Sequence, residues 1–395
     1  MKKFIQYLDA YKDVDQIQPI EYISILDQIN MNFMRNKLAS DQQIYNPISN
    51  YSLWQNQHDC SQMFELPPPH PETPKEYREI DSNTTIESIH DLLNVIEKYP
   101  YDDSVQYNID IKILHAIKPE LTELNNMIGL ESFKNQVIDQ LLYFMQNLHV
   151  GKTSDYKHTV LYGPPGTGKT EIAKIVGQIY SKIGILPNAT FQKVTRSDLI
   201  AGYLGQTAIK TQKVIEKSLG GVLFIDEAYS LADSQQNDSF SRECIDTLCE
   251  AMSQYKDNWM VIIAGYEQEI KQQLFKTNAG LESRFIWRFT LDPYDSKELF
   301  SIFQKKVENN EWLLENLDKK EGEKWFHKNK ESFPYYGRDM EALFTYTKIA
   351  HGRRIFGKSV EKKVITMEDL EKGFTAFQKY SKDKKKESVL YSMYC

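Results

Sequence analysis

The chain has 395 residues, 41% of them hydrophobic and 26% charged, with a formal net charge of −7. This length predicts two or three domains, and the composition is that of a soluble globular protein. The acidic balance disfavours a protein that mainly coats nucleic acid, the four scattered cysteines argue against a zinc site or a disulfide framework, and no apolar run is long enough to span a membrane.

Residues 1–118 contain no glycine and are rich in asparagine, glutamine, tyrosine and isoleucine. Two stretches, 20–38 and 85–97, carry apolar residues at helical spacing. Between them, the proline-rich run 66–74 predicts an extended, flexible spacer. We therefore expect a small, mainly helical N-terminal region in which no chemistry can be recognised.

From residue 119 to 294, β-prone apolar runs alternate with helical patterns, which is typical of a wound parallel sheet. The expected strands are 159–162, 190–194, 222–225, 260–264 and 288–291. The expected helices between them are 169–181, 208–218, 241–255 and 267–277. This part of the chain is therefore predicted to be an α/β domain.

From residue 295 to 381 the pattern is helical throughout, which predicts a cap of helices on the α/β domain. The expected segments are 296–308, 320–330, 338–350 and 367–380. The last residues, 382–395, begin with a basic run that is more typical of a solvated tail than of a binding patch.

The residues after the first expected strand of the α/β domain fit the pattern G-x-x-x-x-G-K-[ST]. They are Gly163, Pro164, Pro165, Gly166, Thr167, Gly168, Lys169 and Thr170. Glycines let consecutive N–H groups point at a polyphosphate, and the following helix directs its positive end there. Lys169 is then expected on the β- and γ-phosphates, and the Thr170 hydroxyl on Mg²⁺. A chance glycine-rich turn is the alternative, but the strand before the pattern and the helix after it favour a nucleotide site.

An acidic pair, Asp226 and Glu227, follows the buried apolar run 221–225. By itself, such a pair would be interpreted as two solvated acids at a strand end. Together with a phosphate loop it predicts hydrolysis, because this position supplies a metal carboxylate and a base. We expect Asp226 to hold Mg²⁺ through its water shell and Glu227 to polarise the attacking water.

Several further motifs occur in a fixed order around these two. They are LNNMIGL at 124–130, YLGQTA at 203–208, LGGVLFIDEAYSL at 219–231, IAGY at 263–266 and NAGLESRF at 278–285. Together they resemble the CbxX/CfqX group of AAA-plus ATPases, which includes red-type Rubisco activases and sporulation and type VII secretion ATPases. The phrasing also resembles AAA-plus proteins of giant DNA viruses. The resemblance covers about residues 120–350.

The resemblance implies a nucleotide-binding α/β domain, 119–294, followed by a helical lid, 295–381, in a ring usually of six subunits. Arg284 matches the arginine finger that reaches the γ-phosphate of the next subunit. Arg288 is a second candidate, for which an ordinary exposed role at a strand edge is favoured. Arg338 matches the sensor-2 arginine of the lid, although without the resemblance it would be interpreted as a surface residue.

Three further positions follow from the same resemblance. Ile128 and Gly129 match the linker that lines the adenine pocket, a role compatible with a helix-entry contact. Tyr203 and Leu204 match a loop that faces the ring's pore and grips a client chain, with packing of Tyr203 beneath its own loop as the alternative. Most AAA-plus proteins place a polar Asn or Thr after the fourth strand, whereas Ala264, Gly265, Tyr266 and Glu267 occupy that position here, so no sensor-1 residue is assigned.

The sequence thus predicts an ATPase that uses ATP and Mg²⁺ and remodels an unidentified protein client, as a homo-oligomeric ring expected to be a hexamer. Lys169, Mg²⁺, Arg284 and Arg338 would stabilise charge on the transferred phosphoryl group. One alternative is a nucleic-acid motor or loader, which the acidic charge disfavours. Another is a nucleotide-gated scaffold with low turnover, which Glu227 and Arg284 disfavour. No membrane or nucleic-acid partner is expected, and the expected location is the cytoplasm, or the host cytoplasm if the chain is viral.

Overall fold

The computed structural model describes residues 76–81, 85–151, 154–203, 205–232, 239–315, 318–359 and 361–394. The chain divides into two units, Met1–Thr73 and Pro74–Cys395, and every described residue belongs to the second. The helical stretch expected at 20–38, the proline-rich spacer at 66–74 and the predicted pore-loop residue Leu204 therefore lie outside the described residues.

Five parallel strands form the central sheet, in the order β4-β5-β6-β3-β7. They are β3 (Thr159–Tyr162), β4 (Phe191–Val194), β5 (Val222–Ile225), β6 (Met260–Gly265) and β7 (Trp287–Thr290). The central strands β3, β5 and β6 are buried along their whole length, as expected of a sheet covered on both faces. Because the strands are parallel, the loops that follow them gather at one edge of the sheet.

Helices cover both faces of this sheet. Successive residues of a strand point to opposite faces and so belong to two separate hydrophobic clusters. Leu161 belongs to the cluster shared with α6 and α7, whereas its neighbour Val160 belongs to the cluster shared with α10. The helices are α6 (Glu131–Met145), α7 (Lys169–Lys182), α8 (Arg196–Leu199), α9 (Thr207–Ser218), α10 (Ser239–Gln254), α11 (Glu267–Glu269), α12 (Phe275–Thr277) and α13 (Ala279–Arg284). A 3₁₀ turn, η2 (Ala228–Leu231), follows β5, and a π-helical turn, η3 (Ile270–Leu274), joins α11 to α12.

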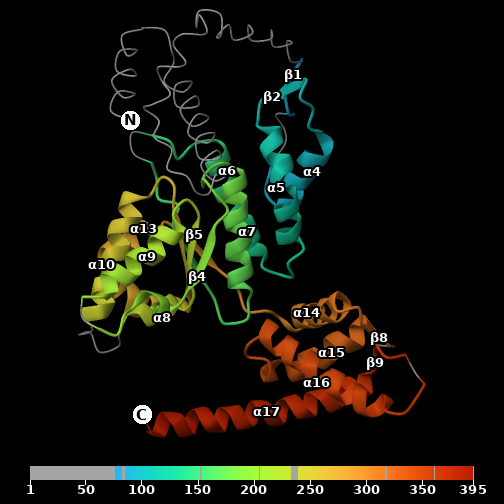
Figure 1. Ribbon diagram of the computed structural model, residues 1–395. Coiled ribbons are helices and arrows are strands. Elements are labelled where there is room, and N and C mark those ends of the chain that lie inside the picture. Colours follow the sequence, from blue (N-terminus) through green and yellow to red (C-terminus); the bar gives the residue numbers. More distant parts are fainter. Residues whose placement is uncertain are drawn as a thin grey trace, which may run out of the picture. The chain divides into compact units, whose positions relative to one another are not determined.

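Two short strands and two helices precede the sheet in the sequence. Strands β1 (Glu76–Arg78) and β2 (Val105–Tyr107) are parallel, and α4 (Ile89–Lys98) packs on α5 (Ile111–Asn125). Helix α5 in turn packs on α7 of the core (Figure 1). The domain boundary expected between residues 118 and 119 falls inside α5, whose residues Ile117, Leu121 and Leu124 form one buried face across it.

The C-terminal part, which we call the lid, consists of helices α14 to α17 with a short pair of parallel strands. Its elements are α14 (Ser296–Asn309), β8 (Leu313–Leu314), α15 (Lys319–Asn329), η4 (Lys330–Ser332), α16 (Gly337–Ile355), β9 (Val364–Ile365) and α17 (Met367–Tyr394). Packed aromatic rings, among them Phe303, Phe326 and Phe333, form its core. Helix α17 continues past residue 381, so the expected start of a tail at 382 falls inside this helix.

These elements confirm the expected fold class, an α/β parallel-sheet core with a C-terminal helical lid and a small, mainly helical region before it. Within the described ranges, no helix combines the length and the apolar character that crossing a bilayer requires.

Candidate functional site

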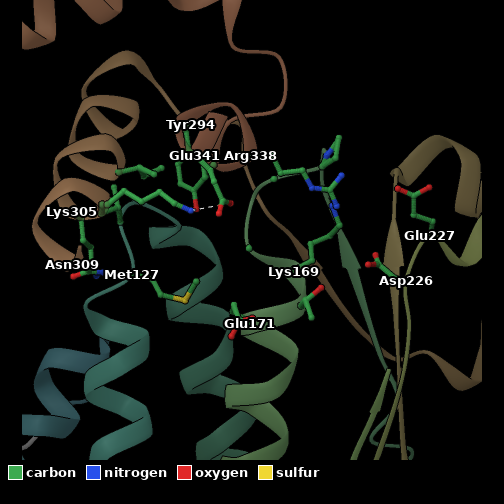
Figure 2. A pocket seen from close by; sticks show the side chains of 18 residues that line it. Met127, Lys169, Glu171, Asp226, Glu227, Tyr294, Lys305, Asn309, Arg338 and Glu341 are labelled. Carbon is green, nitrogen blue, oxygen red and sulfur yellow. Dashed lines mark ion pairs between the residues drawn. The ribbon is translucent and has the colours of Figure 1, made fainter. Parts of the chain in front are cut away.

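A cavity of about 610 Å³ lies where the loops after β3 and β5 meet helices α14 and α16 of the lid (Figure 2). Figure 2 shows Asp226 and Glu227 on one side of it, Lys305 and Asn309 on the other, and Lys169 and Arg338 between them. The residues that line it are Met127, Ile128, Pro165, Gly166, Gly168, Lys169, Thr170, Glu171, Asp226, Glu227, Tyr294, Ile302, Lys305, Lys306, Asn309, Gly337, Arg338 and Glu341. Most residues predicted for the nucleotide site from the sequence thus meet at one cavity.

The predicted phosphate loop leads directly into helix α7, which begins at Lys169. The first N–H groups of a helix have no partner within it, so this end of α7 is suited to bind an anion. The Lys169 ammonium donates to the carbonyls of Gly163 at 2.8 Å and Pro164 at 2.7 Å. Burial lowers the pKa of Lys169 to about 8. Gly163, Pro164 and the buried Thr167 do not line the cavity; they hold the loop in shape, since the Thr167 hydroxyl also donates to Pro164.

Gly166 brings the phosphate loop into contact with the lid. Its φ of +83° is a left-handed conformation that favours glycine, and a Cβ at this position would lie 2.0 Å from the carbonyl oxygen of Tyr335. The N–H of Gly337 donates to the Gly166 carbonyl at 3.1 Å. The first turn of α16 therefore rests directly on the loop.

The Asp226 carboxylate and the Thr170 hydroxyl, which are expected to hold Mg²⁺, both contact the same ammonium group in this structure. The ammonium of Lys193, on β4, is 2.8 Å from the Asp226 carboxylate and 3.3 Å from the Thr170 hydroxyl. The ammonium is thus a stand-in for a metal cation between these two side chains. Carboxylate and hydroxyl oxygens are the donors that Mg²⁺ prefers, so this pair fits the ion.

Glu227 follows Asp226 in a left-handed conformation, with φ 50° and ψ 48°, at the entrance to the turn η2. Its side chain is exposed and lines the cavity. The Tyr229 hydroxyl donates to Glu227 Oε2 at 2.7 Å. The carboxylate is therefore available to a water molecule in the cavity and is held by one neighbouring phenol.

Arg338 reaches the cavity from the lid, as the second residue of α16. Within the part of the chain that the structure describes, its guanidinium forms no hydrogen bond or ion pair, so it can bind a phosphate without breaking an existing contact. On the same side of the cavity, Lys306 forms an ion pair with Glu341 at 3.1 Å, between α14 and α16.

One face of α14 contributes cavity residues that sequence reasoning missed. Ile302, Lys305, Lys306 and Asn309 stand at positions i, i+3, i+4 and i+7 of this helix. The spacing is visible in the sequence, but nothing in it shows that this mixed polar face covers a cavity. Tyr294, Met127, Glu171 and Glu341 were missed in the same way, although Met127 lies within a recognised motif.

The predicted adenine linker is only partly at the cavity. Ile128 lines it, whereas Gly129 does not. Gly129 has a φ of +64°, and a Cβ there would lie 2.1 Å from the Glu298 carboxylate of α14. Gly129 therefore makes room for the lid.

Three candidate functional residues, Arg284, Arg288 and Tyr203, do not line the cavity. The Arg284 guanidinium folds back on its own subunit, donating from Nε to the Ser253 hydroxyl at 2.9 Å and from another nitrogen to the Gly280 carbonyl. Arg288, the second candidate, is bonded to the Phe285 carbonyl and to Glu282. Tyr203 is 75% exposed in the loop after β4 and α8.

Comparison with known proteins places this geometry in context. The model of the ATPase family associated with various cellular activities (AAA) matches residues 159–286. A cfxQ-like protein of Acanthamoeba polyphaga mimivirus is 40% identical over 278 residues, 70% of this chain and 68% of that protein. Stage V sporulation protein K of Bacillus subtilis is 34% identical over 231 residues, 56% of this chain and 70% of that protein. The ESX-1 secretion system protein EccA1 of Mycobacterium tuberculosis is 41% identical over 187 residues, 46% of this chain but only 32% of EccA1.

Proposed function

The chain belongs to the AAA-plus ATPases of the CbxX/CfqX type, and from this premise we propose that it couples ATP hydrolysis to the remodelling of a protein partner, as a ring of identical subunits. As a member of this family it is a phosphate-loop enzyme that binds and hydrolyses ATP. The observation that carries the hydrolysis in this proposal is one cavity, which Lys169, Asp226, Glu227 and Arg338 line from three separate parts of the chain.

Each of these side chains has a role in the proposed reaction. Lys169 and the N-terminus of α7 bind the β- and γ-phosphates. Glu227 accepts a proton from the attacking water as the water oxygen bonds to the γ-phosphorus and the bond to the leaving β-phosphate oxygen breaks. Arg338 neutralises the charge that spreads over the phosphoryl oxygens.

Mg²⁺ is proposed as the resident cation because Lys193 already brings a positive charge to Thr170 and Asp226. When bound, the ion would neutralise the phosphate oxygens. Thr170 and Asp226 would hold it, the latter through the metal's water shell. The Lys193 side chain is 44% exposed, which leaves it room to turn into solvent when the site fills.

The ring and the client are further parts of the proposal. Arg284 lies outside the cavity of its own subunit, so a role on the γ-phosphate is proposed across a subunit interface. Tyr203 is exposed in a loop between two glycines, which supports a role in contacting a client polypeptide. We propose the cytoplasm, or the host cytoplasm if the chain is viral, as the compartment.

Two variants test the chemistry. In Glu227→Gln, ATP binding is expected to persist while turnover falls about 10²–10⁴-fold, the usual contribution of general-base help. In Lys169→Ala, ATP binding itself is expected to be lost. Both are measured with purified protein, by titration calorimetry with ATP and by phosphate release. Wild-type turnover in Glu227→Gln would overturn the assignment.

The same Glu227→Gln variant also tests the proposed coupling to a client, since it should hold ATP and retain whatever it acts on. Proteins recovered with Glu227→Gln in ATP, and not with Lys169→Ala, are candidate clients. Their addition to the wild-type enzyme should raise its ATPase rate. Stimulation by single-stranded nucleic acid, with no effect of any recovered protein, would contradict the remodelling of a protein partner.

A further inference from the structure

Strand β6 ends at Gly265, between the two strands that carry the chemistry of the site. On one side it pairs with β3, which leads into the phosphate loop, and the Gly163 N–H donates to the Gly265 carbonyl at 3.1 Å. On the other side it pairs with β5, which leads into Asp226 and Glu227. A side chain at position 265 would therefore stand close to both, yet glycine has none.

The ring of Tyr229 occupies the space that such a side chain would need. A Cβ on Gly265 would lie 2.9 Å from Cδ1 and 3.2 Å from Cε1 of Tyr229, closer than real Cβ atoms normally approach a ring. The neighbouring ring of Tyr266 packs against Tyr229, with centroids 6.2 Å apart at 45°. Glycine at position 265 therefore leaves space for the Tyr229 ring and for the Ile270 side chain, whose Cδ1 would lie 3.2 Å from the same Cβ.

With its ring packed over Gly265, the Tyr229 side chain places its hydroxyl within hydrogen-bond distance of Glu227. It donates to Oε2 at 2.7 Å, across the 3₁₀ turn η2 that begins immediately after Glu227. Hydrogen bonds to an ionised carboxylate are short and strong compared with those between neutral groups. Within the described ranges, no other hydrogen bond or ion pair holds the Glu227 carboxylate. Its position at the cavity wall thus depends on one phenol.

We propose that Tyr229 is the positioning residue of the hydrolytic base: its hydroxyl fixes the Glu227 carboxylate at the cavity, and Gly265 provides the space for its ring. The inference rests on the proposed role of Glu227 in hydrolysis. It also accounts for the lack of a polar side chain at the end of β6. Tyr229, in the turn after the adjacent strand β5, makes the contact with Glu227 that a polar residue at the end of β6 could otherwise make.

The variant Tyr229→Phe tests this role, because it keeps the ring packed over Gly265 and removes only the hydroxyl. We expect kcat to fall about tenfold, as for loss of one hydrogen bond to a charged group. The KM for ATP and the ATP affinity are expected to stay within about twofold of wild type, since the hydroxyl contacts the base and not the nucleotide. The matched control is Tyr266→Phe. In the wild type, the Tyr266 hydroxyl forms no hydrogen bond with any residue that the structure describes. This control should retain wild-type kcat.

A double variant separates positioning from a structural role. If Tyr229 acts through Glu227, adding Tyr229→Phe to Glu227→Gln should lower turnover no further. An additional fall in that background, or a melting temperature several degrees below wild type, would instead mark Tyr229 as structural and overturn the inference.

The outcomes also distinguish this inference from the proposed function. If Glu227→Gln loses turnover while Tyr229→Phe keeps wild-type kcat, the role of Tyr229 is wrong and that of Glu227 stands. If Glu227→Gln keeps wild-type turnover, both are wrong. A tenfold lower kcat at unchanged KM in Tyr229→Phe, together with loss of turnover in Glu227→Gln, supports both.

Discussion

Tyr203 is a large aromatic side chain that the fold leaves in solvent. It is 75% exposed, and a Cβ on either Gly202 or Gly205 would meet no atom within 4 Å, so the loop has open space around it. Packing beneath its own loop, the alternative considered from the sequence, does not fit this exposure. Exposed aromatic rings on surface loops are suited to contact an extended chain.

We therefore expect Tyr203→Ala to change the free energy of unfolding by no more than about 0.5 kcal/mol, as for other surface substitutions. Basal ATPase should stay at the wild-type level because the residue lies outside the cavity, while client-stimulated ATPase should be lost. Melting curves and ATPase assays with a recovered client measure both. Tyr77→Ala, at another exposed tyrosine, serves as the control. Full stimulation in Tyr203→Ala would contradict the role in client binding.

At the scale of elements, the sequence predicted buried strands well and irregular features poorly. Strands β3 and β5 have the predicted bounds, because a strand buried on both faces is a continuous apolar run. Helix α4 begins four residues later than the expected 85, at Ile89, because Ser88 and Asp91 form a capping box. The helix expected at 267–277 contains the π turn η3, which apolar spacing does not reveal.

The residues of the candidate site likewise fall into those that the sequence predicts and those that depend on how distant elements pack. The phosphate loop and the acidic pair are local patterns whose chemistry is evident from consecutive residues, and residues of both line the cavity. The contribution of α14 depends on how the lid packs on the core, and the contact of Tyr229 with Gly265 depends on the register of β5 and β6. Neither relation is present in any single stretch of sequence.

A buried histidine links elements of the core and makes their stability depend on pH. His158 precedes β3; its Nδ1 accepts from the Val261 N–H of β6 at 3.0 Å, and its Nε2 donates to the Met252 carbonyl of α10 at 3.2 Å. Burial lowers the pKa of His158 to about 3, well below its ordinary value of 6.5. The neutral ring is thus the form that fits the folded protein.

Between about pH 6.5 and 3 the unfolded chain therefore binds a proton that the folded protein excludes. The stability conferred by the neutral ring is present above pH 6.5 and is lost as the pH falls, by up to about 1.4 kcal/mol per pH unit. We expect urea midpoints of wild type to fall more steeply between pH 7 and 5 than those of His158→Asn, whose amide oxygen can still accept from the Val261 N–H and does not titrate. Parallel pH dependence of the two proteins would contradict this account.

At the scale of the whole molecule, the position of Arg284 leads to a prediction about assembly. Its guanidinium is bonded within its own subunit and does not line that subunit's cavity. If it acts on ATP in a neighbouring subunit, Arg284→Ala should bind ATP and hydrolyse it poorly. Mixing Arg284→Ala with Lys169→Ala should restore part of the activity, because some interfaces then join an intact phosphate loop to an intact arginine.

The test is the ATPase rate across mixing ratios, with the mass of the assembly followed by light scattering in ATP. Activity above the sum of the two separate variants supports a shared site. The matched control mixes Arg284→Ala with Glu227→Gln, which binds ATP without turnover and should restore activity by the same route. A fully active monomer would contradict a site shared between subunits.

The hydrogen bond from Gly337 to Gly166 has a mechanical consequence. Helix α16 begins at this contact and extends for 19 residues, which corresponds to a rod of about 28 Å. It packs along α17, so a tilt of α16 would carry α17 with it. A tilt of about 10° at the phosphate loop would displace the far end of such a rod by about 5 Å. A tilt of α16 about its contact with the phosphate loop would thus move the distal end of the lid the most.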